Sequence, residues 1–239
     1  MLDDYRRSFG EAYEAVVRTI RQRGEFPTGR LAKSTRSIVE KLHRESIRLS
    51  QMQDIAGCRV VVMDVVQQEQ FVASLKTDFP GASVIDRRNN PSYGYRAVHI
   101  IAEISGKPIE IQVRTSLQHL WAELSEKSSD VLDPTIKYGG GPDYWRNILT
   151  LSSKAVASYE NLEKVPVVAL ENWKKSIVEL RSQYVTEPYE ELLRDEELRI
   201  FMKAKAENLK LVRAWNELAD VMHGAISWLD ERRLKEQKQ

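Results

Sequence analysis

The chain has 239 residues, 42% of them hydrophobic and 30% charged, and a formal net charge of +1, which is typical of a globular protein without bias toward nucleic acids or membranes. The single cysteine, Cys58, excludes an intrachain disulfide and a cysteine-based metal site, and its apolar neighbours indicate a buried, inert thiol. The chain has neither a signal-peptide pattern at its start nor the roughly 18 consecutive apolar residues of a membrane span, so a cytoplasmic location is expected.

The N-terminal part of the chain is expected to form two helices. Apolar residues recur at helical spacing across residues 3–23, and Pro27 and Gly29 end this pattern. The second helix is expected over residues 31–46. Neither helix alone indicates a function.

Two charged features accompany the second helix. A row of cations with one hydroxyl falls on one narrow helix face, because its members are spaced 3, 4, 4 and 3 residues apart: Arg30, Lys33, Ser37, Lys41 and Arg44. Such a row suits a triphosphate, although a solvated basic face is the commoner use of the pattern. Asp54 precedes an apolar run and suits Mg²⁺ bound together with substrate phosphates, although a helix cap or turn is the commoner use.

The middle of the chain, from about residue 57 to 114, has strand character. A buried strand is expected at 59–63 and a helix at 66–79, followed by strands at 83–85, 95–104 and 108–114. The last two strands flank Ser105-Gly106 and are expected to form a hairpin. This order predicts an α+β fold with a mixed central sheet flanked by helices.

Two of these strands carry polar side chains on one face. Strict alternation along the last strand places Glu110, Gln112 and Arg114 on the face opposite its apolar residues. Tyr95 and His99 are four residues apart on the preceding strand and share a face. These side chains could line an active site, but an exposed sheet face with a half-buried tyrosine and a structural histidine is the ordinary alternative.

The remainder of the chain is expected to be helical after Thr115. Gly139-Gly140-Gly141-Pro142 indicates a linker, which divides the chain into a core at 1–138 and a helical C-terminal extension at 142–239. An apolar stripe on the long helix of the extension indicates intramolecular packing or an oligomer contact: Leu209, Val212, Leu218, Met222, Ile226 and Leu229.

Five motifs in order resemble the RelA/SpoT-type alarmone synthetases, especially their small single-domain members. The matching segments are Arg30-Leu31-Ala32-Lys33 with Ser37-Ile38-Val39-Glu40-Lys41-Leu42, Asp54-Ile55-Ala56-Gly57-Cys58-Arg59-Val60, Gly94-Tyr95-Arg96-Ala97-Val98-His99, Glu110-Ile111-Gln112-Val113-Arg114-Thr115 and His119-Leu120-Trp121-Ala122-Glu123. These segments cover less than half of the chain.

The resemblance implies transfer of pyrophosphate from ATP to the ribose 3′-hydroxyl of GDP or GTP, with release of AMP. It implies that Asp54 and Glu110 hold Mg²⁺ and that Glu110 helps to deprotonate the attacking hydroxyl. It further implies an ATP site formed by Arg30, Lys33, Ser37, Lys41 and Arg59. The implied acceptor site is formed by Tyr95, His99, Gln112 and Arg114, with the tyrosine ring stacked on the acceptor base.

The loop before Gly94 departs from the family pattern. Many relatives carry a Pro-Lys-x-x-Gly-Tyr loop, whereas this chain has Pro91-Ser92-Tyr93-Gly94-Tyr95, which is one residue shorter and has serine in place of the lysine. A free guanine nucleotide therefore loses an expected cation, for which Arg87 or Arg88 could compensate.

This departure leaves a second hypothesis open for the acceptor. The family includes toxins that pyrophosphorylate the 3′-terminal adenosine of tRNA, with tRNA and an antitoxin protein as partners. A homo-oligomer formed through the C-terminal helices is also open, as is a nucleotide-binding module without activity, against which the presence of both carboxylates argues. Only four histidines are present, and no hydrolase-type His-Asp motif accompanies them.

Overall fold

The computed structural model describes residues 2–161 and 188–237, without the side chains of Arg30, 188–209 and Leu211. The chain divides into two compact units, Met1–Ala122 and Glu123–Gln239. The expected linker at Gly139-Gly140-Gly141 thus lies inside the second unit. Whether the parts at 1–138 and 142–239 are separate domains stays a prediction.

The first unit is built around a five-stranded sheet. Its strands are β1 (Thr28–Arg30), β2 (Ala56–Val62), β3 (Ser83–Asp86), β4 (Val98–Ile104) and β5 (Lys107–Thr115), in the order β1-β2-β5-β4-β3. β2 and β5 pair in parallel and the other neighbours pair antiparallel, so the predicted mixed sheet is confirmed. The expected hairpin joins β4 to β5 through Ser105 and Gly106, which both have positive φ, as a two-residue hairpin loop requires.

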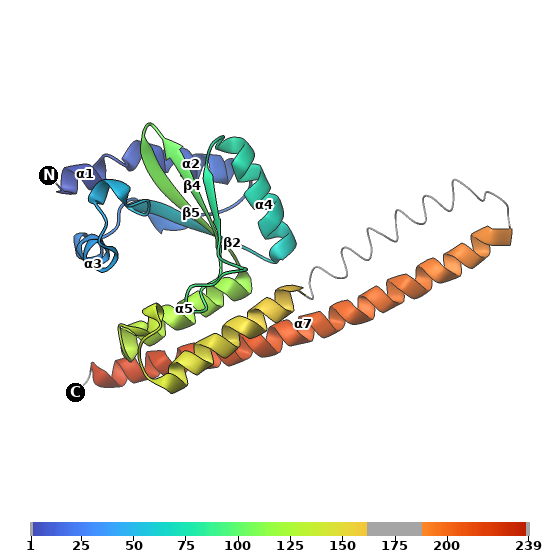
Figure 1. Cartoon of the computed structure of the whole chain (residues 1–239). Coiled ribbons are helices and arrows are strands. Elements are labelled where there is room, and N and C mark those ends of the chain that lie inside the picture. The colour runs from blue at the N-terminus through green and yellow to red at the C-terminus, as the bar shows by residue number, and fades with distance from the viewer. Residues whose placement is uncertain (1, 162–187, 238–239) are drawn as a thin grey trace. The chain divides into compact units, whose positions relative to one another are not determined.

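Helices cover the apolar face of this sheet. The first unit contains α1 (Leu2–Arg7), α2 (Gly10–Gln22), α3 (Thr35–Glu45), the 3₁₀ turn η1 (Leu49–Gln51) and α4 (Val65–Asp78). α2 and α4 contact the central strands, as Figure 1 shows. Alternate strand residues such as Cys58 and Ile111 are buried in the core with Ile20 and Leu75 of these helices. The predicted buried thiol therefore belongs to the core, and burial raises the pKa of Cys58 to about 12.

The first predicted helix is interrupted. The structure has two helices within 3–23, and the break between them falls just before Gly10, a residue of low helix propensity. Phe9, at the break, is fully buried, and its ring packs against that of Tyr5 with centroids 5.3 Å apart. The turn thus places an aromatic side chain in the core.

The second predicted helix begins later than its spacing suggests. α3 starts at Thr35, because Ser34 has an extended backbone and its Oγ accepts a hydrogen bond from Ser37 N. Arg30 instead ends β1, and Lys33 lies in the connecting loop. The predicted row of five is therefore wrong as a single helix face, and the members that α3 does carry are Ser37, Lys41 and Arg44.

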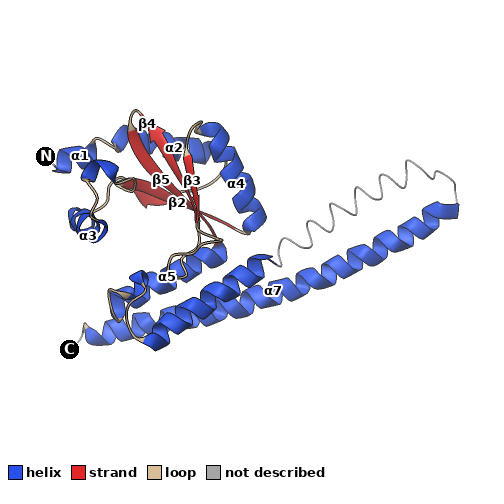
Figure 2. Cartoon of the chain, in the orientation of Figure 1, coloured by secondary structure: helices blue, strands red, loops and turns tan. Residues whose placement is uncertain are grey.

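Helices joined by short turns make up the second unit, and none of its described residues lies in a strand, as Figure 2 shows. α5 (Ser116–Val131) crosses into it from the first unit, and it continues with the 3₁₀ turn η2 (Ile136–Tyr138), a helix over 143–161 and α7 (Pro188–Glu236). The predicted helical C-terminal part is therefore confirmed. No helix among the described residues is long and apolar enough to cross a membrane.

Part of the apolar stripe on α7 packs within this unit. Met222 and Leu229 are buried, and Lys127 of α5 pairs with Asp230 next to them. Val212 is half exposed, and the Leu209 side chain lies outside the described residues. The C-terminal end of the stripe is therefore intramolecular core, whereas assembly through these helices stays a prediction.

Candidate active site

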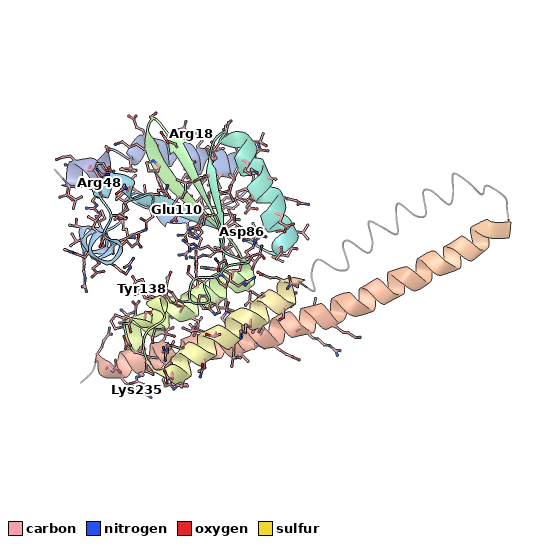
Figure 3. The ribbon with its side chains drawn as sticks, in the orientation of Figure 1. Arg18, Arg48, Asp86, Glu110, Tyr138 and Lys235 are labelled. Carbon is pink, nitrogen blue, oxygen red and sulfur yellow. The ribbon has the colours of Figure 1, made fainter. Side chains whose placement is uncertain are left out.

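The polar face of the sheet gathers side chains from several strands. Residues directly opposite each other on paired strands share a face. Gln112 of β5 lies opposite His99 of β4 and opposite Arg59 of β2, while Ile111 and its alternate neighbours point into the core. Figure 3 shows Glu110, two residues before Gln112, on this sheet. The alternation predicted from the sequence therefore creates one polar face across β2, β5 and β4.

Five side chains on this face form a closed ring of hydrogen bonds. His99 Nδ1 lies 2.8 Å from Glu110 Oε1, and Gln112 Nε2 donates to Glu110 Oε2 at 2.8 Å. Arg114 Nη2 donates to Gln112 Oε1 at 2.9 Å and to the Tyr95 hydroxyl at 3.0 Å. The Tyr95 hydroxyl lies 2.9 Å from His99 Nε2, which closes the ring. Both oxygens of the Glu110 carboxylate are therefore held in place.

The donors in this ring can be assigned from the network. Because Arg114 donates to the Tyr95 oxygen, the tyrosine O–H is free to donate to His99 Nε2. The remaining ring nitrogen, Nδ1, then carries the proton that it donates to Glu110. A neutral histidine thus satisfies every contact in the ring.

The surroundings of Glu110 and Tyr95 set their charge states. Burial raises the pKa of Glu110, but the hydrogen bonds that His99 and Gln112 donate to the carboxylate lower it, and the pKa lies below its ordinary value. Burial raises the pKa of Tyr95 more than the neighbouring Arg114 lowers it. At neutral pH the carboxylate is ionised and the phenol is a neutral donor.

Asp54 lies between two lysines in front of β2. Its Oδ2 is 2.6 Å from Lys33 Nζ, and its Oδ1 is 3.0 Å from Lys41 Nζ. Burial raises the pKa of Asp54, but the two ammonium groups lower it further than burial raises it. The structure therefore joins two of the predicted phosphate-binding lysines to the predicted metal ligand.

Whether Asp54 and Glu110 hold Mg²⁺ stays a prediction. Asp54 Oδ1 is buried and makes no hydrogen bond of good geometry, although Lys41 Nζ lies 3.0 Å from it. The charge of Asp54 raises the pKa of Glu110, so the two carboxylates interact. The described residues contain no group of three or more acidic, histidine or cysteine ligands, and Mg²⁺ is commonly held by one or two carboxylates plus substrate phosphates.

The other predicted ATP ligands come from β1, β2 and α3. Arg59 is half buried on β2, on the same face as Gln112. Ser37 lies in the first turn of α3, where Ser34 Oγ is 2.8 Å from its Oγ. Arg30 ends β1 opposite Gly57, but its side chain lies outside the described residues.

The loop before Tyr95 is a tight two-residue turn. Tyr95 N donates to Ser92 O at 2.9 Å, and the two central residues, Tyr93 and Gly94, have φ of +54° and +93°. Positive φ is uncommon for a bulky residue, and the ring of Tyr93 is 64% exposed. The shortened loop thus presents a second tyrosine next to the ring of hydrogen bonds.

Comparison with known proteins shows what the region that carries this site is similar to. Residues 29–129 match the model of a family described as the region found in RelA/SpoT proteins. This part of the chain, less than half of its length, is similar to the RelA/SpoT-type domain. All eleven predicted site residues, from Arg30 to Arg114, fall within it.

Relatives of the RelA/SpoT-type domain occur in longer proteins. An uncharacterised protein of Mycobacterium tuberculosis is 35% identical over 116 residues, which are 47% of this chain and 42% of that protein. A probable chloroplastic GTP diphosphokinase of Arabidopsis thaliana is 32% identical over 96 residues, which are 38% of this chain and 13% of that protein. The chain therefore spans less than half the length of the curated relatives that it matches.

Solved structures of similar fold cover more of the chain. Small alarmone synthetase 1 from Bacillus subtilis is 27% identical with a TM-score of 0.50, and the match covers 72% of this chain and 96% of that one. Small alarmone synthetase 2 from the same organism is 22% identical with a TM-score of 0.51, covering 70% and 99%. The second likeness concerns the fold alone, and the predicted fold class is confirmed.

Sequence reasoning missed a residue that supports the site from behind. Gln68 of α4 is fully buried, and its Nε2 donates to Val113 O of β5 and to Gln118 Oε1, both at 2.8 Å. This contact ties α4 to the strand that carries Glu110. The signal in the sequence was a polar residue within the apolar face of a helix, which marks a buried hydrogen bond when it is not exposed.

Proposed function

We propose that the RelA/SpoT-type domain transfers pyrophosphate from ATP to the ribose 3′-hydroxyl of GDP or GTP. The hydroxyl oxygen forms a bond to the β-phosphorus of ATP, the bond from that phosphorus to the α,β-bridging oxygen breaks, and AMP leaves. The products are guanosine tetra- or pentaphosphate and AMP. The observation that carries this proposal is the ionised Glu110, held by two hydrogen bonds, whose pKa is raised by the charge of Asp54, itself paired with two lysines.

The donor site is formed on the side of Asp54. Mg²⁺ held by Asp54 and Glu110 would neutralise charge on the phosphates of ATP. With Mg²⁺ as the partner of Asp54, Lys33 and Lys41 would exchange their contacts with this carboxylate for contacts with the phosphate oxygens. Arg59 lies on the same face, where its guanidinium can stack on adenine.

Glu110 is the group that receives the proton of the attacking hydroxyl. It is ionised at neutral pH, and the hydrogen bonds from His99 and Gln112 fix its direction. A fixed carboxylate aligns the hydroxyl with the scissile bond, which lowers the barrier by orientation. Gln112 and His99 act by positioning this carboxylate.

The acceptor base stacks on Tyr95 in this proposal. The guanidinium of Arg114 lies over the tyrosine ring at 5.0 Å from its centroid, and the His99 ring meets it edge-on at 5.6 Å. These contacts hold the ring in one orientation. The ring face away from Arg114 is the face that a base uses.

A second candidate is transfer to the 3′-terminal adenosine of tRNA, and the exposed Tyr93 favours it. The exposed Tyr93 side chain can stack on the base that precedes the terminal adenosine of tRNA. A free nucleotide has no such neighbouring base. This candidate would bring tRNA and an antitoxin protein as partners. Either reaction uses ATP, and we expect it to take place in the cytoplasm.

An acceptor panel tests both candidates. The purified chain is incubated with Mg²⁺ and ATP labelled in the γ-phosphate, together with GDP, GTP or total tRNA. Label in guanosine tetra- or pentaphosphate supports the first candidate, and label in RNA with loss of aminoacylation supports the second. Glu110→Gln is the matched inactive control, and absence of AMP release with every acceptor would overturn both.

A further inference from the structure

Two consecutive arginines after β3 differ in the charge of their partners. Arg88 is neutralised, because its guanidinium pairs with Asp86 at 2.6 Å and with Glu69 at 3.4 Å. Arg87 has no carboxylate partner among the described residues, and its Nη1 donates to the neutral hydroxyl of Ser92 at 2.8 Å. Arg87 therefore keeps an uncompensated positive charge.

The sheet register places Arg87 on the same face as the ring of hydrogen bonds. Arg87 N donates to Ala97 O at 2.9 Å, which extends the antiparallel pairing of β3 and β4 by one residue. Ala97 lies midway between Tyr95 and His99, and cross-strand partners share a face. Arg87 thus reaches the polar face from β3, the edge strand next to β4.

Lys33 and Arg87 lie toward opposite edges of the sheet from Glu110. Lys33 lies in the loop between β1 and α3, and its backbone N donates to Ile55 O just before β2. Arg87 follows β3 at the other edge, and the strand order puts β5, with Glu110, between them. A reaction between two phosphorylated nucleotides needs this arrangement, because each polyanion requires its own cation on its own side of the reacting hydroxyl.

We propose that Arg87, oriented by Ser92, binds the 5′-phosphates of a free nucleoside di- or triphosphate acceptor. A guanidinium forms two parallel hydrogen bonds with phosphate oxygens. The turn that holds Ser92 also positions Tyr95, so one rigid segment carries the phosphate contact and the proposed base platform. This inference rests on the proposed function and adds the residue that selects phosphorylated acceptors.

The test compares Arg87→Gln with Arg88→Gln as a matched control. Both variants remove one guanidinium from neighbouring positions, but only the first removes a cation from the polar face. We expect Arg87→Gln to raise KM for GDP about ten- to hundredfold, as for the loss of a charge-assisted hydrogen bond, while KM for ATP and for guanosine stays near the wild-type value. Arg87→Lys, which keeps the charge, should recover part of the loss. Arg88→Gln should leave KM for GDP unchanged and lower Tm.

Calorimetry of GDP binding distinguishes failure of the inference about Arg87 from failure of the proposed function. Wild-type binding that is lost in Arg87→Gln, with an unchanged circular dichroism spectrum, supports the inference. An unchanged KM and affinity for GDP in Arg87→Gln overturns it while leaving the proposed function intact, as does an equal loss for GDP and guanosine. A wild-type chain that neither binds GDP nor uses GDP or GTP, or that labels only RNA, overturns the inference together with the proposed nucleotide acceptor.

Discussion

His99 Nδ1 and Glu110 Oε1 are joined at 2.8 Å across the hairpin of β4 and β5. His99 lies directly opposite Gln112, so its contact with Glu110 is diagonal, two residues along the neighbouring strand. The histidine is 7% exposed, and the Tyr95 hydroxyl fixes its other nitrogen. Glu110 therefore depends on a partner that is itself immobile.

Glu110→Gln should abolish transfer without unfolding the chain. The change keeps the shape of the side chain but removes the charge, and general-base catalysis is worth about 10²–10⁴-fold in rate. We expect kcat to fall by at least this factor, with Tm within a few degrees of wild type. Glu103→Gln, at an exposed position on β4 of the same hairpin, is the control and should be fully active. Turnover near the wild-type rate would remove Glu110 from the chemistry.

His99→Leu should shift the pH dependence of the reaction. The hydrogen bond from His99 lowers the pKa of Glu110, while burial raises it, so removal of the donor raises the pKa. The acidic limb of kcat/KM, which follows protonation of Glu110, should move to higher pH. His99→Asn supplies an amide N–H and should reverse part of the shift. A lower Tm with an unmoved limb would mean that His99 only packs against its neighbours.

Asp54→Asn should separate ATP binding from turnover. The neutral amide no longer holds Lys33 and Lys41, so both become available to metal-free ATP. We expect ATP affinity in EDTA to equal or exceed that of wild type, and turnover with Mg²⁺ to fall at least about a hundredfold because a charged metal ligand is lost. Calorimetry measures the affinity. Asp64→Asn, where asparagine preserves the N-cap of α4, is the control. Weaker ATP binding in EDTA would contradict the exchange of lysine contacts.

Stability in acid should depend on the contacts of Asp54 with Lys33 and Lys41. The lysines lower the folded-state pKa of Asp54, so its contribution to the free energy of unfolding is present above the unfolded carboxyl pKa of roughly 3.9 and disappears as pH falls through the folded value. Lys41→Met raises the folded pKa, so stability should decline at higher pH than in wild type. Urea unfolding at several acidic pH values measures this, with the exposed Lys76→Met as control. If the free energy of unfolding of Lys41→Met and of wild type depends on pH in the same way, the contact between Lys41 and Asp54 does not stabilise the fold.

Tyr93→Gly tests whether the second tyrosine has a role beyond the turn. A left-handed conformation costs a non-glycine residue roughly 1–2 kcal/mol, which glycine avoids, so Tm should stay the same or rise. We expect transfer to GDP to be unchanged. Tyr93→Asn provides the same relief with a polar side chain and should behave alike. Loss of RNA labelling in both variants would instead favour the tRNA acceptor.

The polar face could be predicted because it follows from a local property. Strict alternation over Glu110, Gln112 and Arg114 fixes their common face whichever strand lies next to them. The closed ring could not be predicted, since it requires the register of β4 against β5 and the turn that brings Tyr95 to Arg114. Periodicity specifies a face, whereas register specifies which side chains meet on it.

The start of the chain shows where local reasoning failed. The helical pattern does end before Gly29, but the sequence does not show that Gly29 lies in β1, where a Cβ would come within 2.5 Å of Gly57 O. A three-residue strand is too short to show a period, and its pairing with β2 joins residues far apart in the sequence. The helix start at Thr35 depends on the cap at Ser34, which outweighed the spacing of the cations.

The parallel pairing of β2 and β5 has a consequence for the growing chain. Asp54 precedes β2 and Glu110 lies on β5, and α4, β3 and β4 separate the two strands in sequence. Contacts between distant segments form late, because a long loop must close before they contribute. During synthesis, the two carboxylates cannot come together until the ribosome has released β5. A nascent chain that ends before β5 therefore carries Asp54 without Glu110, and the polar face of the sheet is complete only after β5 has joined β2.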